Sequence, residues 1–141
     1  GSAAEIAGVA DRTGWCPVDP VNFASRLQRN IHVIGDAAIA GAMPRSASAA
    51  HSQGEICATA IAAQLSGREI ARPTLNSSCY SLIAPDYAIS QKGTSRPTDD
   101  QYVEAGGGIV LSPLIASREQ RGSEARDAES WFHGLTTSVF G

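Results

Sequence analysis

The sequence predicts an α+β fold, with a long helix in the first half of the chain and a short antiparallel sheet followed by a terminal helix in the second half. The stretch from about Ser46 to Leu65 is rich in Ala and contains no Pro, which favours a helix. Two β-favouring runs lie on either side of the turn sequence Ala84-Pro85-Asp86, a pattern typical of a hairpin. The last part of the chain, from Ser117 or Ser123 onward, has apolar residues at helical spacing.

The chain before the long helix predicts only short elements. We expect an apolar strand around Ile6–Val9 and a helical turn near Asn22–Leu27. Gly1-Ser2 is interpreted as the remnant of a cleavage site introduced for expression, and it is left out of the fold. Ile31–Ile34 consists of apolar or β-favouring residues, so we expect a buried strand there.

The long helix has recognisable ends and a stripe of small residues. Ser46 can begin it, and Gly67 is a suitable C-terminal cap. Gly54, in its middle, costs about 1 kcal/mol relative to Ala, which predicts a tight contact at that position. The stripe that we expect to pack against another element is Ala50, Gly54, Cys57, Ala58, Ile61 and Leu65.

Pro73 marks a boundary after which a second unit is expected. Two strands are predicted there, at about Ser77–Ile83 and Tyr87–Lys92. A third strand is predicted before Gly106-Gly107-Gly108, which we expect to form a loop. The final helix, capped by Ser117 or Ser123, is expected to carry one apolar face, made of Ala125, Ala128, Phe132 and Leu135.

The sequence around Gly35-Asp36-Ala37 has the features of a cofactor site. Gly35 allows a ligand to approach the backbone closely, and Asp36, expected at the end of a strand, can accept hydrogen bonds from ribose or ribityl hydroxyls. Met43-Pro44-Arg45-Ser46 then leads into the long helix, whose N-terminal amides and positive dipole end can face an electron-rich group. A core strand, a turn Asp and a capped helix without any ligand are the alternative interpretation.

Composition limits the possible function. The chain has 141 residues and a net charge of -3, and its lack of a basic patch argues against a nucleic-acid partner. Aromatic residues are few and small residues many, a composition suited to close backbone packing around a cofactor. The sequence contains no signal peptide and no run long enough to span a membrane.

The three cysteines, Cys16, Cys57 and Cys79, are not arranged as metal ligands. None is spaced Cys-x-x-Cys and the three His residues are scattered, so no metal site is predicted. Cys57 lies within the long helix and is interpreted as a small buried residue, as is Cys16. Cys79 lies in the polar run Asn76–Tyr80, and both a redox-active and a structural thiol fit that setting.

Sequence blocks spread along the chain carry a family resemblance. They are Thr13–Pro20, Ile31–Ala37, Met43–Ser46, Ser52–Gly54, Asn76–Pro85, Glu129–Phe132 and Phe140-Gly141. Together they resemble the flavoprotein subunit of flavocytochrome c sulfide dehydrogenase. The blocks Gly14–Asp19 and Cys79–Pro85 are specific, whereas Gly-Asp-Ala is shared with flavin disulfide reductases and quinone reductases.

The resemblance implies a domain organisation. The chain corresponds to the C-terminal third of that subunit. Residues 3–70 would be the C-terminal piece of a Rossmann-like FAD-binding domain, and residues 71–141 the C-terminal domain of the family, an α+β unit with a short antiparallel sheet and a terminal helix. Residues 1–2 are the expected remnant described above.

The resemblance also implies roles for individual residues. Cys79 would be catalytic, as one half of a redox disulfide whose second cysteine belongs to the N-terminal part of the subunit. Trp131 is either a partly buried anchor of the last helix or an aromatic near the flavin that faces the haem partner, and Tyr80 is either a strand core residue or a wall of the flavin pocket. Phe132 stands where the family often has Tyr, so no role of that hydroxyl is expected. The implied FAD-binding residues are Gly35, Asp36, Met43, Pro44, Arg45, Ser46, Tyr80 and Trp131.

For the full-length protein, the resemblance implies an FAD-dependent sulfide:cytochrome c oxidoreductase of the periplasm. Sulfide would attack the disulfide, the flavin would take two electrons, and a c-type cytochrome subunit would receive them singly. We expect the fragment alone not to retain FAD and to form a homodimer. Two alternatives are a fragment of a sulfide:quinone or NADH:quinone oxidoreductase, and a non-catalytic module that self-associates.

Overall fold

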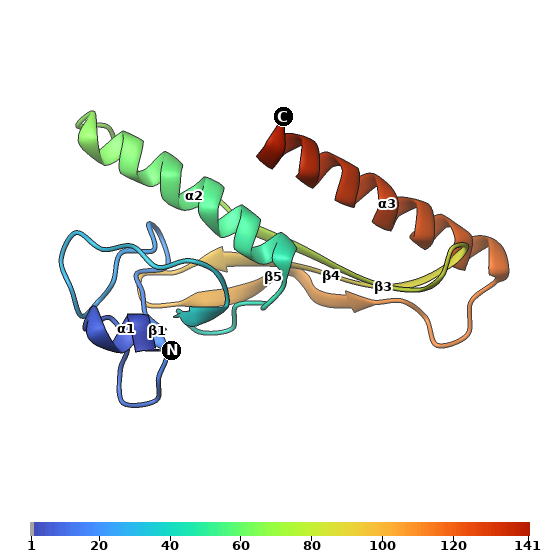
Figure 1. The fold of residues 1–141 in the computed structure, drawn as a ribbon, viewed down its shortest axis with the longest axis horizontal. Coiled ribbons are helices and arrows are strands. Elements are labelled where there is room, and N and C mark those ends of the chain that lie inside the picture. Colours follow the sequence, from blue (N-terminus) through green and yellow to red (C-terminus); the bar gives the residue numbers. More distant parts are fainter. Residues whose placement is uncertain (1) are drawn as a thin grey trace. The chain divides into compact units, whose positions relative to one another are not determined.

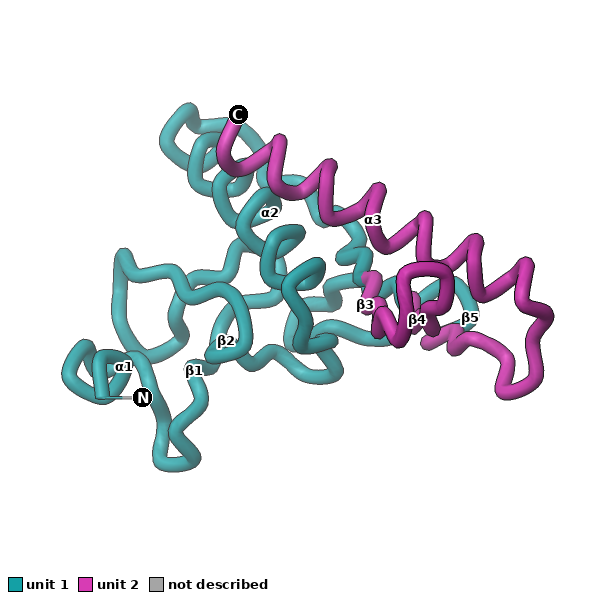
Figure 2. The backbone as a smooth tube through the Cα atoms, turned by 45° about the vertical axis from the view of Figure 1, so that its right-hand side comes forward, with its two compact units in different colours: residues 1–77, 93–108 teal, residues 78–92, 109–141 magenta. Residues whose placement is uncertain are grey.

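The computed structural model describes residues 2–141, so Gly1, part of the expected remnant, lies outside the described residues. The chain forms two compact units (Figure 2). The first comprises the chain up to Ser77 together with Gly93–Gly108, and the second comprises Ser78–Lys92 together with Ile109–Gly141.

The elements follow one another as an α+β chain (Figure 1). Two short strands pair in parallel, with Cys16 opposite Ala38. The three long strands form an antiparallel sheet in chain order, which confirms the predicted fold class of the second half. The bounds are α1 Ser2–Ile6, β1 Cys16–Pro17, the 3-10 helix η1 Gly35–Ala37, β2 Ala38–Ile39, α2 Ala47–Leu65, β3 Leu75–Ala84, β4 Tyr87–Pro97, β5 Tyr102–Leu111 and α3 Arg118–Phe140.

The core of the first unit is built around two aromatic residues. Phe23 and Tyr102 stack with ring centroids 6.0 Å apart, and both are fully buried with Val18 and Leu75. Burial, together with the charge of the nearby Asp19, raises the pKa of Tyr102 to about 12. Phe23 has φ of 61°, a left-handed conformation that is strained for a bulky residue. Its buried ring therefore holds the backbone in a conformation that local preference disfavours.

The strand predicted at Ile31–Ile34 is absent, and this expectation was wrong. Ile31 and Ile34 are exposed, and only His32 forms a bridge, with Ala24. Gly35, with φ of 75°, ends the extended run, and η1 and β2 follow it. The segment pairs with one loop and has no strand on either side, so its apolar residues cannot be buried in a sheet. Ile6–Val9 is not a strand either, since α1 continues to Ile6.

Both predicted ends of α2 are confirmed. The Ser46 hydroxyl accepts a hydrogen bond from the Ala49 amide at 3.1 Å, which satisfies one of the free N–H groups at the helix start. At the other end Gly67 has φ of 64°. The amide of Gly67 donates to the Gln64 carbonyl, and the amide of Arg68 donates to the Ala63 carbonyl. This is the Schellman arrangement, in which a left-handed Gly closes the helix.

The predicted packing stripe of α2 was wrong by about one residue. Of its members only Cys57 is buried, and Leu65 is largely exposed. Gln53 is fully buried because its side-chain oxygen accepts a hydrogen bond from the Gly35 amide at 2.7 Å. A hydropathy pattern assigns a polar residue such as Gln53 to the outer face of a helix. The predicted stripe is therefore rotated around the helix relative to the buried face. The buried residues are Ala49, Gln53, Ile56, Cys57, Ala60 and Ala63.

The glycine loop predicted at residues 106–108 was also wrong. Gly106, Gly107 and Gly108 lie within β5, with φ of 64°, 97° and 80°. Gly tolerates these left-handed conformations without the steric cost that a Cβ would bring. The strand is therefore irregular at this point without ending there.

In the second unit, α3 begins after Ser117, whose hydroxyl accepts a hydrogen bond from the Gln120 amide. Of the two predicted caps, Ser117 and Ser123, the structure uses Ser117. Ala125 is buried as predicted, but Phe132 is 61% exposed, so its place on the inner face was wrong. Trp131, one position earlier, is half-buried and continues the buried face that begins at Arg121. Because the buried face of α3 begins with the charged Arg121, the hydrophobic pattern of the sequence placed this face one residue away from its actual position.

Candidate functional site

Cys79 lies on the face of the sheet that α3 does not cover. It is exposed, in contrast to Cys16 and Cys57, which are buried. Its neighbour Tyr80 contacts Trp131 of α3, with ring centroids 6.2 Å apart. Successive side chains of a strand point to opposite faces, so the Cys79 thiol points away from α3.

The open face that bears Cys79 also carries exposed apolar side chains. Ile89 precedes Ser90, and Leu111 precedes Ser112; both serines bond to Glu124 of α3, so Ile89 and Leu111 point to the opposite face. Ile83, four residues after Cys79 in β3, shares its side. Ile83 and Leu111 are 65% and 64% exposed. The second unit thus presents an uncovered apolar surface that bears one thiol.

Tyr80 and Trp131 are brought together on the covered face. The half-buried Trp131 packs against Tyr80, as expected of an anchor that holds α3 on the sheet. Lys92 lies over the Tyr80 ring, 5.6 Å from its centroid, and faces Asp127 at 3.7 Å. The anchoring role accounts for these contacts, and the predicted contact of both rings with a flavin stays a prediction.

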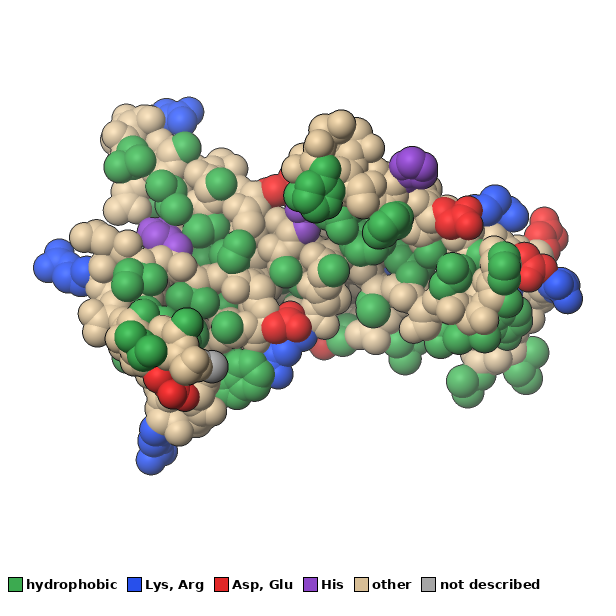
Figure 3. Space-filling model, in the orientation of Figure 1, with side chains coloured by type: hydrophobic (Ala, Val, Ile, Leu, Met, Phe, Trp, Pro, Cys, Tyr) green, Lys and Arg blue, Asp and Glu red, His purple; other side chains and the backbone are tan. Residues whose placement is uncertain are grey.

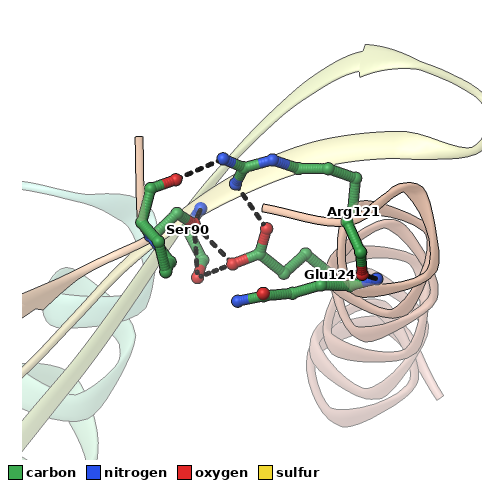
Figure 4. Close-up of polar contacts among 7 residues, drawn as sticks. Ser90, Arg121 and Glu124 are labelled. Carbon is green, nitrogen blue, oxygen red and sulfur yellow. Dashed lines mark hydrogen bonds and ion pairs between the residues drawn. The ribbon is translucent and has the colours of Figure 1, made fainter. Parts of the chain in front are cut away.

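A buried polar network holds β4, the end of β5 and α3 together (Figure 4). One carboxylate oxygen of Glu124 accepts hydrogen bonds from Ser90, at 3.0 Å, and from Ser112. The other oxygen lies 2.9 Å from an Arg121 nitrogen, and Arg121 also donates to the Pro113 carbonyl. Arg121 is 3% exposed, so the pair is shielded from water.

The network determines the ionisation of Glu124. Burial by itself raises the pKa of this carboxyl, but hydrogen bonds from Ser112, Ser90 and Arg121, together with the Arg121 charge, outweigh burial and lower the pKa below its ordinary value of 4.5. This network was not predicted from the sequence. The signal that could have found it is the Arg121/Glu124 pair at a spacing of three residues in the first turns of a helix.

In the first unit, Gly35 and Asp36 lie beside α2. The Gly35 amide is engaged by Gln53, and a Cβ at Gly35 would lie 3.8 Å from the Ala50 methyl. Asp36 is exposed in η1, so its carboxylate is open to a ligand. The first turn of α2 contains no acidic residue that would offset its dipole. These features fit a ligand with hydroxyls and an electron-rich edge.

Residues 43–46 lie in different environments. Met43 packs against the core of the first unit, and Ser46 uses its hydroxyl to cap α2. The Arg45 guanidinium lies over the ring of Trp15, 3.9 Å from its centroid, a cation–π contact. Pro44 is half-buried. Trp15 was not among the predicted site residues, although it lies in the specific Gly14–Asp19 block.

Among residues 2–141 no group of three or more His, Cys, Asp or Glu side chains is placed to hold a metal ion. No helix in this described part of the chain is long and apolar enough to cross a membrane.

A comparison with protein families supplies one match. Residues 71–140 match the family model described as "Flavocytochrome c sulphide dehydrogenase, flavin-binding". The matched region contains β3, β4, β5 and α3, and therefore Cys79, Tyr80 and Trp131.

Proposed function

Residues 71–140 of this chain belong to the flavin-binding family of flavocytochrome c sulphide dehydrogenase, and we propose that the protein acts in sulfide oxidation. The family implies a flavoprotein with a cytochrome partner. The proposal extends this to a substrate, a catalytic thiol and a direction of electron flow. The observation that carries it is the exposed Cys79 on the open apolar face of the family's sheet.

In this proposal Cys79 forms a disulfide with a second cysteine of the intact protein. Hydrosulfide attacks one of the two sulfurs, so that a new S–S bond forms while the disulfide bond breaks and one cysteine leaves as a thiolate. Over the full cycle the sulfide loses two electrons and a proton, and the disulfide is restored. FAD, when bound, accepts an electron pair and passes single electrons to the haems of a c-type cytochrome.

The position of Cys79 suits this chemistry. Thiol–disulfide exchange requires that a small nucleophile approach a sulfur directly, and an exposed strand residue allows it. The same face carries the exposed Ile83, Ile89 and Leu111, and a planar cofactor or another domain that covered it would remove water from the reacting sulfur. A buried thiol such as Cys57, whose pKa burial raises, lacks this access.

Residues of the first unit are proposed to hold FAD. The exposed Asp36 carboxylate would accept hydrogen bonds from ribityl or ribose hydroxyls. The N-terminal end of α2, next to Met43–Ser46, would stabilise negative charge through its amides and dipole. Gly35 would act through its backbone conformation, since its amide already donates to Gln53. Contact with the flavin is also proposed for Tyr80 and Trp131.

Three further proposals concern the electron-accepting partner, the compartment and the oligomeric state. A c-type cytochrome subunit would take the electrons, in the periplasm, where a disulfide persists. The chain described here would also form a homodimer through residues 31–65, which include the exposed Ile31, Ile34 and Leu65. Exposed apolar side chains favour such association.

The test is reduction of the flavin by sulfide in the intact flavoprotein under anaerobic conditions. Cys79→Ser should slow bleaching of the flavin absorbance by roughly 100-fold or more, because the attacked sulfur is lost. Reduction by dithionite, which needs no disulfide, should remain. Ser81→Ala, at an exposed position of the same strand, is the matched control and should react like the wild type. If Cys79→Ser is reduced by sulfide at the wild-type rate, the proposal is wrong.

A further inference from the structure

Gln53 is a polar side chain on the buried face of α2. It is 1% exposed, and the other buried residues of this helix are small or apolar: Ala49, Ile56, Cys57, Ala60 and Ala63. Burying a side-chain amide costs free energy unless its polar atoms are hydrogen-bonded, whereas an Ala at the same place would bury no polar group. The role of Gln53 therefore lies in the hydrogen bond that it makes.

That hydrogen bond links α2 to the segment that carries Asp36. The Gly35 amide donates to the side-chain oxygen of Gln53 at 2.7 Å. Gly35 has φ of 75° and is the first residue of η1. The residue before it, Ile34, provides no side-chain hydrogen bond to cap η1, so the Gly35 amide, one of the N–H groups that a helix start leaves without an internal partner, is bonded from outside the turn.

Asp36 is thereby held between two fixed points. On its N-terminal side, Gln53 fixes the amide of Gly35. On its C-terminal side, the Ala38 amide donates to the Gly35 carbonyl, and Ala38 is buried and pairs with Cys16 of β1. A 3-10 turn of three residues has little stability by itself. The two attachments therefore determine the course of the backbone at Asp36, whose side chain is exposed.

We infer that Gln53 is a positioning residue for the Asp36 carboxylate, which it holds beside α2 for the hydroxyls of FAD. This inference rests on the proposed function and adds to it a buried residue that acts through Asp36. A carboxylate that is fixed before binding avoids the loss of conformational freedom on binding. The face drawn in Figure 3 shows charged side chains dispersed without a broad patch of one sign. With charges distributed in this way, recognition depends on single groups that are placed accurately.

The test is a double-mutant cycle on FAD binding. The intact flavoprotein is refolded without flavin and titrated with FAD, and quenching of the flavin fluorescence gives the dissociation constant. Gln53→Met keeps the length of the side chain but removes the acceptor, and should raise the dissociation constant roughly tenfold. Asp36→Asn should raise it by at least as much, because the charged acceptor is lost. In the Asp36→Asn background, Gln53→Met should change it by less than about twofold, since Gln53 acts through Asp36.

The matched control is Gln64→Met, which makes the same change at an exposed position of α2. It should bind FAD within roughly twofold of the wild type. Gln53→Ala provides a second cycle, because it also removes the acceptor and Ala is the residue most favourable to a helix. Its dissociation constants should follow those of Gln53→Met in both backgrounds. Circular dichroism establishes which variants are folded, and the cycle is read from those.

Four results would overturn the inference. Wild-type affinity in the Gln53 variants would show that Gln53 does not position the site. Equal weakening in the two backgrounds would show that its role is structural only. Wild-type affinity in Asp36→Asn would show that this carboxylate does not contact FAD. If the wild type does not bind FAD, the proposed cofactor fails and the inference fails with it. The first three results leave the sulfide test on Cys79 unaffected, so the two proposals can fail separately.

Discussion

The three cysteines lie in three environments, and the difference can be measured. Cys79 is exposed, Cys16 is fully buried, and Cys57 is buried within α2 with its pKa raised by burial. Alkylation requires a thiolate that the reagent can reach. Brief treatment with iodoacetamide should therefore label Cys79 first, as peptide mass spectrometry would show.

The control for this labelling is the same chain in urea, in which all three thiols should react at similar rates. A Cys79→Ser variant should lose the early label without gaining another. Predominant labelling of Cys16 or Cys57 in the folded chain would contradict the placement of Cys79.

Glu124 makes stability depend on pH. Because its pKa in the folded chain lies below the ordinary value of 4.5, folding favours the ionised carboxylate. Its stabilising contribution is complete above pH 4.5 and is lost as pH falls through the lower pKa of the folded state. The free energy of unfolding should therefore fall between neutral and acidic pH in the wild type. It should fall less in Glu124→Gln, as urea titrations at several pH values would show.

Other carboxyls titrate in the same range, so the informative quantity is the difference between the two chains. Asp86→Asn is a suitable comparison because Asp86 pairs with Arg118 at an exposed site, where ion pairs contribute about 1 kcal/mol or less. If the wild type and Glu124→Gln lose stability in parallel as pH falls, the carboxylate network does not operate as described.

Among the elements, α2 shows how helix ends are encoded. Gly67 adopts φ of 64°, a conformation that costs an L-residue with a Cβ about 1 kcal/mol. Gly67→Ala should therefore lower the free energy of unfolding by about 1 kcal/mol. Thermal or urea unfolding monitored by circular dichroism would measure the change.

Gly134 is the matched control. It lies within α3, where no atom outside the helix's own nearby backbone comes within 4 Å of an added Cβ, and its φ is not among the positive values of the described glycines. Gly134→Ala should raise stability by about 0.5 kcal/mol, because Ala is the better helix former. Opposite signs for the two Gly→Ala changes are the expected result, and equal signs would refute the C-cap assignment.

For the chain as a whole, the first prediction concerns FAD. The printed sequence contains no Gly-x-Gly-x-x-Gly to grip a pyrophosphate, and one or two hydrogen bonds from Asp36 contribute only about 1–3 kcal/mol. The 141-residue chain should therefore lose added FAD on gel filtration. A protein peak that keeps the flavin absorbance band would show that the residues present suffice.

The second prediction for the chain concerns its association. We expect a dimer through residues 31–65, detected by light scattering coupled to size exclusion. Ile34→Asp, at an exposed apolar position, should shift the mass toward the monomer, while Leu114→Asp should not. A wild-type chain that stays monomeric at high concentration would contradict this prediction.

Several features could be predicted from the sequence because their causes lie within a few residues. Ser46 and Ser117 cap helices through amides three residues away, and Gly67 closes α2 locally. The Ala84-Pro85-Asp86 turn sets the β3–β4 hairpin in the same way. The family of residues 71–140 was likewise recognisable from short blocks.

Tertiary structure alone decided which of these residues are buried. Gln53 is buried because its side-chain oxygen accepts a hydrogen bond from the Gly35 amide. On α3, Trp131 and not Phe132 lies on the inner face, because Trp131 packs against Tyr80. Ile31 and Ile34 are apolar but lie in a segment without neighbouring strands, so both remain exposed. Helix caps and turns are set by hydrogen bonds between near neighbours in sequence, whereas burial depends on partners that only the folded chain brings together.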